Sequence, residues 1–92
     1  MKAKIWNYHR WIRETEPEYL KPKYEDMLKE AGFKLLEFME YHFKPYGYTA
    51  IWLLGESHFA VHTFPEEGKS YIELSSCNRE DFYKFKRAEH SR

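Results

Sequence analysis

The chain has 92 residues, enough for one domain with one modest core. Its fifteen basic and fifteen acidic side chains cancel, which excludes the strongly basic surface of a nucleic-acid-binding protein and a polybasic membrane patch. The longest apolar stretch, Ala50 to Leu54, is too short to span a bilayer, and the N-terminus lacks the apolar core of a signal peptide. We therefore expect a soluble cytoplasmic protein whose single domain covers residues 1–92, without nucleic-acid or membrane partners.

The first predicted elements in chain order are a strand and a helix. Aromatic and β-branched residues over residues 4–12 predict the strand. A helix is expected to start near Pro17 or Pro22 and to end near Ala31, because Gly32 stands where a C-terminal cap belongs. The apolar positions at helical spacing are Leu20, Tyr24, Met27, Leu28 and Ala31.

Four strands and a second helix are predicted to follow. The order β-α-β-β-β-β-α indicates an α+β fold, in which an antiparallel β-sheet carries the helices on one face as a two-layer sandwich. A sheet this small gains stability by pairing with a second copy, so we expect a homodimer. The predicted strands are residues 33–43, 49–54, 58–64 and 70–77, and the predicted helix is residues 81–87.

The composition leaves one cysteine and many aromatic residues to explain. Cys77 is alone, which excludes an internal disulfide and a four-cysteine zinc site. Eighteen of the 92 residues are aromatic, and such side chains serve a core, a pocket for a flat or cationic ligand, or a subunit interface.

The residues that carry chemistry cluster in the second half of the chain. From Glu56 to Glu66 the sequence reads Glu-Ser-His-x-x-x-His-Thr-x-Pro-Glu, and Cys77 follows eleven residues later. This pattern resembles the bacterial and archaeal S-adenosylmethionine decarboxylase family. Eleven ordered positions and a correctly spaced cysteine form a specific signal.

The resemblance implies that the chain cleaves itself. In that family the hydroxyl of Ser57 attacks the carbonyl of Glu56, His62 assists, and the chain splits into residues 1–56 and 57–92 with a pyruvoyl group at residue 57. This cofactor meets a chemical need. Decarboxylation of an α-amino acid leaves electrons that no ordinary side chain takes up, whereas a pyruvoyl carbonyl accepts them through a Schiff base with the substrate amine.

Further site residues also follow from the resemblance. Cys77 matches the proton donor that completes turnover, and a thiol held within reach of the substrate carbon is suited to that role. Thr49 matches a hydroxyl that supports processing. Phe43 and Phe64 match the aromatic residues that sandwich the adenine, and Glu66 matches the carboxylate that binds the ribose hydroxyls.

Self-cleavage requires a special backbone, because an ordinary trans peptide bond resists attack. Gly55 is expected to permit a tight or strained conformation just before the bond that is cut. Strand alternation places Ser57 and His62 on opposite faces of a sheet. We therefore expect a bend near Gly55 and Glu56 that brings the two side chains together.

Several alternatives remain open at this stage. The expected substrate is S-adenosylmethionine, which supplies spermidine and other polyamines, but ornithine or arginine suits the same chemistry. A regulatory paralogue without catalytic activity is an alternative from another class. A core role is an alternative to pocket lining for Phe43 and Phe64, and His58, His62 and Glu66 fit a metal site, although we predict no metal.

The chain also departs from the family pattern. It ends fifteen residues beyond Cys77, where relatives continue with a helix and at least one more strand. The segment Gly68-Lys69-Ser70-Tyr71 and Glu73 replaces a common Gly-Tyr-Ala-Ala and Asp, and Asn78 replaces a common glycine. These changes lie near the expected substrate pocket, so they bear on which substrate is bound.

Overall fold

A computed structural model describes residues 3–91 and has the predicted order of elements. Each boundary lies within three residues of its predicted position, and the short turn of 3-10 helix was not predicted. Ser57 is the first residue of a strand that was predicted to begin at residue 58. The elements are β1 (Trp6–Ile12), α1 (Pro17–Ala31), β2 (Leu35–His42), β3 (Tyr48–Leu54), β4 (Ser57–Phe64), η1 (Pro65–Glu67), β5 (Lys69–Ser76) and α2 (Arg79–His90).

The ends of α1 follow from a proline and a glycine. Pro17 is the first helical residue, where its missing N–H costs nothing, and Pro22 lies inside the helix. Gly32 adopts a φ of 105°, and the N–H of Phe33 donates to the carbonyl of Leu28 at 3.0 Å, which closes the helix. The predicted cap is confirmed, and Pro17 is the proline that starts the helix.

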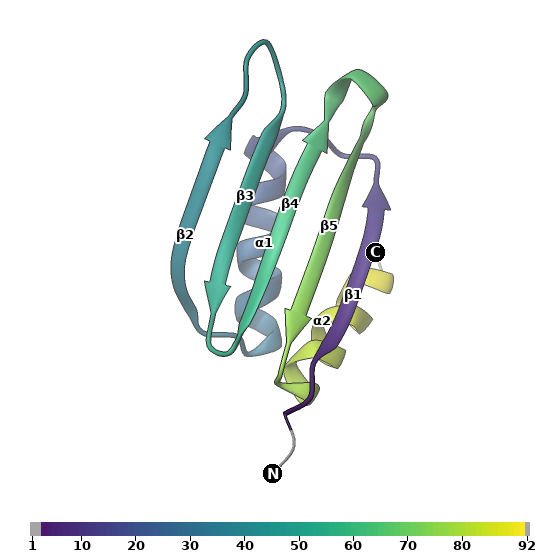
Figure 1. The fold of residues 1–92 in the computed structure, drawn as a ribbon. Helices are drawn as coiled ribbons and strands as arrows, with labels where there is room; N and C mark the ends of the chain where they lie inside the picture. The colour runs from purple at the N-terminus through teal and green to yellow at the C-terminus, as the bar shows by residue number, and fades with distance from the viewer. Residues whose placement is uncertain (1–2, 92) are drawn as a thin grey trace.

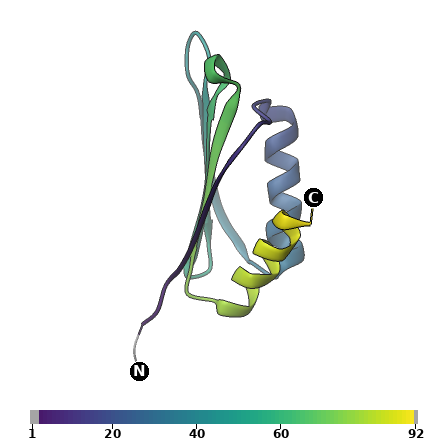
Figure 2. The same ribbon diagram turned by 90° about the vertical axis from the view of Figure 1, so that its right-hand side faces the viewer.

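The five strands form one antiparallel sheet in the order β1-β5-β4-β3-β2 (Figure 1). Both helices lie on the same face of this sheet, as the edge-on view shows (Figure 2). The predicted α+β two-layer arrangement is confirmed. β4 lies at the centre between β3 and β5, so the part of the sequence motif from Ser57 to Phe64 lies in the interior of the sheet, and Glu56, Glu66 and Cys77 lie at the ends of strands.

The core fills the space between the sheet and the two helices. On α1 the buried residues are the five predicted from helical spacing. Strands β3, β4 and β5 bury every second side chain against them, as the alternation of a half-covered sheet requires. The largest fully buried side chains include Trp52, Tyr24, Phe59 and Phe85.

The other face of the sheet, which we call the open face, is covered by no element within residues 3–91 (Figure 2). Met39 on β2 is paired with Ile51 on β3, and these side chains are 73% and 41% exposed. Leu53, two residues further along β3, is 48% exposed. An apolar patch of this kind favours contact with another surface.

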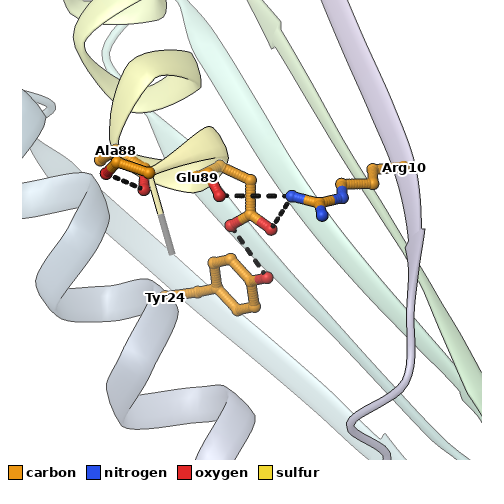
Figure 3. A network of polar contacts seen from close by, with 5 residues as sticks. Arg10, Tyr24, Ala88 and Glu89 are labelled. Carbon is orange, nitrogen blue, oxygen red and sulfur yellow. Dashed lines mark hydrogen bonds and ion pairs between the residues drawn. The ribbon is translucent and has the colours of Figure 1, made fainter.

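A buried carboxylate fastens α2 to the rest of the molecule (Figure 3). Glu89 is only 3% exposed, and its carboxylate accepts hydrogen bonds from Arg10 of β1 at 3.1 Å and from the hydroxyl of Tyr24 of α1 at 3.2 Å. Burial, followed by the nearby charge of Glu89, raises the pKa of Tyr24 far above its ordinary value. The phenol therefore stays protonated and keeps donating to Glu89.

Candidate functional site

The peptide bond predicted to be cut lies at the tip of the hairpin between β3 and β4. Gly55 and Glu56 form its two-residue turn, and Ser57 pairs with Leu54 as the first residue of β4. Glu56 has a φ of 56°, a left-handed conformation that costs a residue with a Cβ roughly 1–2 kcal/mol. The turn is strained as predicted, but the strained residue is Glu56 and not Gly55.

The hydroxyl of Ser57 is buried and bound to a second serine. Ser57 points to the helix-covered face, is 7% exposed, and donates from Oγ to Oγ of Ser76 at 2.8 Å. Ser76 lies directly opposite on β5 and is fully buried. Its Oγ also accepts the backbone N–H of Asn78, the N-cap of α2, at 2.9 Å. The hydroxyl of Ser57 therefore has a fixed hydrogen-bond acceptor.

Sequence reasoning missed Ser76, although a signal for it was present. Alternation along β5 places Ser70, Ile72, Leu74 and Ser76 on the buried face. A buried serine needs a hydrogen-bond partner, because an unpaired hydroxyl in the core is costly. The pairing of Ser76 with Ser57 across the sheet meets that need, but only the register of the strands reveals it.

The carbonyl of Glu56 receives a hydrogen bond from the end of β5. The backbone N–H of Cys77 donates to this oxygen at 3.3 Å. A donor at this oxygen stabilises the negative charge that develops when the carbonyl carbon is attacked. The Cys77 side chain itself is exposed. The structure thus brings the backbone of Cys77, and not its thiol, to the bond between Glu56 and Ser57.

His62 lies apart from this group, on the open face. Its Nδ1 is 3.0 Å from Oγ1 of Thr49, its direct partner on β3. Ser57 and His62 stand on opposite faces of the same strand, and five residues at about 3.3 Å each separate them by roughly 17 Å. The predicted bend that unites Ser57 and His62 is wrong, because the turn precedes Ser57 and the strand runs uninterrupted to His62.

A cleft of about 270 Å³ opens beside His62 and Thr49. It lies where the loop between β2 and β3 meets the end of β4. Five of the residues predicted from the sequence line it, and Tyr46, Gly47 and Thr63 were not foreseen. The predicted residues are Phe43, Thr49, His62, Phe64 and Glu66.

The predicted site residues thus form two groups in one chain. The cleavage group contains Glu56, Ser57 and Cys77 and lies at the β3–β4 turn. The cleft group contains the two aromatic residues, the histidine, the threonine and the carboxylate at the other end of β4. Phe43 is 49% exposed at the end of β2, so it lines the cleft and does not belong to the core.

The structure also bears on metal ions and membranes as possible partners. Within residues 3–91, no three histidine, cysteine or acidic side chains gather as a metal site would require. His58 and His62 share the open face but stand four residues, or about 13 Å, apart along the strand. Neither helix of the same residues has the length and apolar character needed to cross a membrane.

Comparisons with known proteins agree on one family. The family model described as S-adenosylmethionine decarboxylase matches residues 9–89. The S-adenosylmethionine decarboxylase proenzyme of Prochlorococcus marinus (strain MIT 9313) is 36% identical over 63 residues, which are 68% of this chain and 50% of that protein. The proenzyme of Aquifex aeolicus (strain VF5) is 36% identical over 53 residues, which are 58% of this chain and 39% of that one.

A solved structure supports the fold. The crystal structure of the adenosylmethionine decarboxylase from Aquifex aeolicus VF5 superposes with a TM-score of 0.77 at 21% identity, covering 95% of this chain and 78% of that one. In sequence, the matches to the proenzymes of Prochlorococcus and Aquifex cover half or less of each of those proteins.

Proposed function

The chain belongs to the S-adenosylmethionine decarboxylase family, and from this premise we propose that it is a self-processing decarboxylase that acts on S-adenosylmethionine. The observation that carries the proposal is the arrangement of Glu56, Ser57 and Cys77. A strained residue, a held hydroxyl and a backbone donor converge on one peptide bond. Structural stability alone does not call for this combination at a hairpin tip.

Each residue has a defined part in the cleavage. Oγ of Ser57 attacks the carbonyl carbon of Glu56, its proton passes to the amide nitrogen of residue 57, the C–N bond breaks, and an ester joins residue 56 to the side chain of residue 57. The N–H of Cys77 stabilises the oxyanion that forms on the way. Loss of the ester by elimination releases residues 1–56 with a carboxylate. Hydrolysis of the remaining enamine consumes water, releases ammonia and leaves the pyruvoyl group on residues 57–92.

Ser76 orients the hydroxyl of Ser57. Its Oγ accepts the hydrogen bond of that hydroxyl and is itself fixed by the N–H of Asn78. This contact aims the hydrogen of Ser57 away from Glu56 and leaves a lone pair of Oγ for the attack. The residues around Ser57 therefore fit the formation of the pyruvoyl group that the family makes from its serine.

We assign His62 to the cleavage group of a second copy. It lies roughly 17 Å from its own Ser57 by strand geometry. The cleft beside it, about 270 Å³, falls below the roughly 300–1,000 Å³ of ordinary small-molecule sites. The apolar open face around Met39 and Ile51 gives a second copy a surface to cover. A homodimer thus completes a site that one chain holds only in part.

The cleft has the chemistry for a nucleoside that carries a positive charge. Phe43 and Phe64 offer aromatic faces to a flat base and to a sulfonium cation, and Glu66 offers a carboxylate to ribose hydroxyls. The pyruvoyl carbonyl supplies the electron sink for decarboxylation. To the exposed thiol of Cys77 we assign the return of a proton to the substrate carbon.

Release of carbon dioxide from carboxyl-labelled substrates tests this function. We expect release from S-adenosylmethionine and none from ornithine or arginine, with the uncleaved Ser57→Ala chain as the blank. Release from ornithine or arginine alone would contradict the proposed substrate. A chain that stays intact and releases nothing from any of the three would instead identify a regulatory paralogue.

A further inference from the structure

Two aromatic residues outside the cleft lie against two residues inside it. We propose that Tyr71 of β5 is a positioning residue for the imidazole of His62 and that Trp11 of β1 is a positioning residue for the ring of Phe64. This inference rests on the proposed function, in which His62 and Phe64 belong to the site. It adds a specific role for side chains that neither the sequence motif nor the cleft includes.

The register of the sheet aligns these residues in one row. Trp11 pairs with Tyr71, Tyr71 pairs with His62, and His62 pairs with Thr49. Paired residues point to the same face, so the four side chains lie side by side on the open face. The row begins at the edge strand β1 and ends at the cleft.

His62 is held from two sides by its neighbours in the row. The ring of Tyr71 lies 6.4 Å from the imidazole with 28° between their planes, a stacked arrangement. On the opposite side Oγ1 of Thr49 is 3.0 Å from Nδ1. A single hydrogen bond leaves an imidazole free to tilt about it, whereas an adjacent ring face fixes its plane. Nε2 is then the nitrogen presented to a reacting group.

Trp11 supports Phe64 in the same way. Their ring centroids are 5.9 Å apart, and Trp11 is itself 5.2 Å from Tyr71. The ammonium of Lys69 lies 4.4 Å from the centroid of the Trp11 ring and 3.5 Å from a carboxylate oxygen of Glu67. Trp11 is 52% exposed, yet it has three side-chain neighbours that restrict it. Phe64 thereby meets a ligand with its ring already placed.

Nuclear magnetic resonance of the Ser57→Ala chain tests the positioning directly, because that chain stays in one piece. Replacing Tyr71 with Ala or Leu removes the ring current over His62, so the imidazole protons of His62 should shift downfield. Tyr71→Phe should leave them in place, because the ring and not the hydroxyl makes the contact. Trp11→Ala should move the ring protons of Phe64, and Trp11→Phe should largely restore them. Tyr83→Ala, an exposed aromatic residue of α2, is the control.

The same substitutions, made in the chain that retains Ser57, test the effect on the rate of self-cleavage. Tyr71→Ala should slow self-cleavage about tenfold through lost orientation, and Tyr71→Phe should restore the rate. His62 resonances that do not move in Tyr71→Ala and Tyr71→Leu would overturn the role of Tyr71, and unmoved Phe64 resonances would overturn that of Trp11. Absence of cleavage in the unmodified chain would refute the proposed function alone, because the resonance shifts do not depend on cleavage.

Discussion

At the scale of single residues, the reactivity of Ser57 depends on its neighbours. Ser76, which lies opposite on β5 and is fixed by the N–H of Asn78, accepts a hydrogen bond from the Ser57 hydroxyl and holds its orientation. It is no base, so in the proposed cleavage the Ser57 proton passes to the nitrogen that leaves the carbonyl of Glu56. Glu56 adds backbone strain next to that carbonyl. The proposed cleavage site is therefore built by two strands and one turn.

Ser76→Ala should slow self-cleavage by about tenfold, which corresponds to ~1.4 kcal/mol in the barrier. The change removes the hydrogen-bond acceptor that orients the Ser57 hydroxyl and keeps the strand intact. Ser75→Ala is the matched control, because Ser75 points to the open face and bonds to Asn7. The amount of intact chain over time, measured by mass spectrometry, gives both rates. Equal rates for the two variants would remove Ser76 from the mechanism.

The sequence motif identified some site residues and not others, for a physical reason. Ser57 and Cys77 are recognisable because their spacing is part of a linear pattern, and the structure brings the backbone of Cys77 to the carbonyl of Glu56. Ser76, Trp11 and Tyr71 pair with residues of neighbouring strands, and only the register of the sheet assigns those partners. The expected meeting of Ser57 and His62 does not occur in one chain, because the turn precedes Ser57 and β4 alternates regularly from there to His62.

At the scale of elements, α2 depends on one buried carboxylate. Glu89→Ala should lower the free energy of unfolding by about 3 kcal/mol, because it leaves Arg10 and Tyr24 without their shared acceptor. Urea unfolding measures the loss. Glu67→Ala removes an exposed ion pair with Lys69 and should change stability by only about 0.5 kcal/mol. Similar losses of unfolding free energy in both variants would show that burial of Glu89 does not explain its contribution to stability.

The same network predicts how stability responds to alkali. Burial and the charge of Glu89 raise the pKa of Tyr24 above the value of 10.0 that it has when unfolded. Above pH 10 the unfolded chain therefore binds fewer protons than the folded one, and stability falls as pH rises. Tyr24→Phe should flatten this fall by up to about 1.4 kcal/mol per pH unit. Urea unfolding of both chains at a series of pH values above 10 gives this dependence. Equal slopes of unfolding free energy against pH for the unmodified chain and for Tyr24→Phe would contradict the prediction.

The helices and strands were predicted from the sequence better than their arrangement in the sheet. The five buried positions of α1 follow from helical spacing, and Pro17 and Gly32 mark its ends. The 3-10 turn at Pro65–Glu67 was not predicted, since a proline followed by two glutamates also suits an ordinary turn. The order of strands in the sheet depends on contacts distant in sequence, which local patterns do not contain.

At the scale of the whole molecule, the separation of the two groups of site residues is the reason for proposing a homodimer. In one chain the cleavage group and the cleft group stand at opposite ends of β4. The apolar open face supplies a surface on which a second copy can lie. In the homodimer that we propose, His62 of one copy would lie at the β3–β4 turn of the other.

Mixing two inactive variants tests this arrangement. His62→Ala keeps its own Ser57, and Ser57→Ala keeps its own His62, so neither should cleave alone. If the subunits exchange a histidine, the mixture should cleave the His62→Ala chain. Mass spectrometry distinguishes the two chains by mass. Cleavage of His62→Ala without its partner, or none in a mixture shown to contain mixed dimers, would refute the assignment.

The central claim is that the chain cuts itself between Glu56 and Ser57. The intact mass of the purified chain, followed over time, tests it most directly. We expect the 11.3 kDa species to give way to residues 1–56 and to residues 57–92 with a blocked first residue, and Ser57→Ala to remain whole. An intact chain after prolonged incubation, or cleavage that persists in Ser57→Ala, would contradict the account.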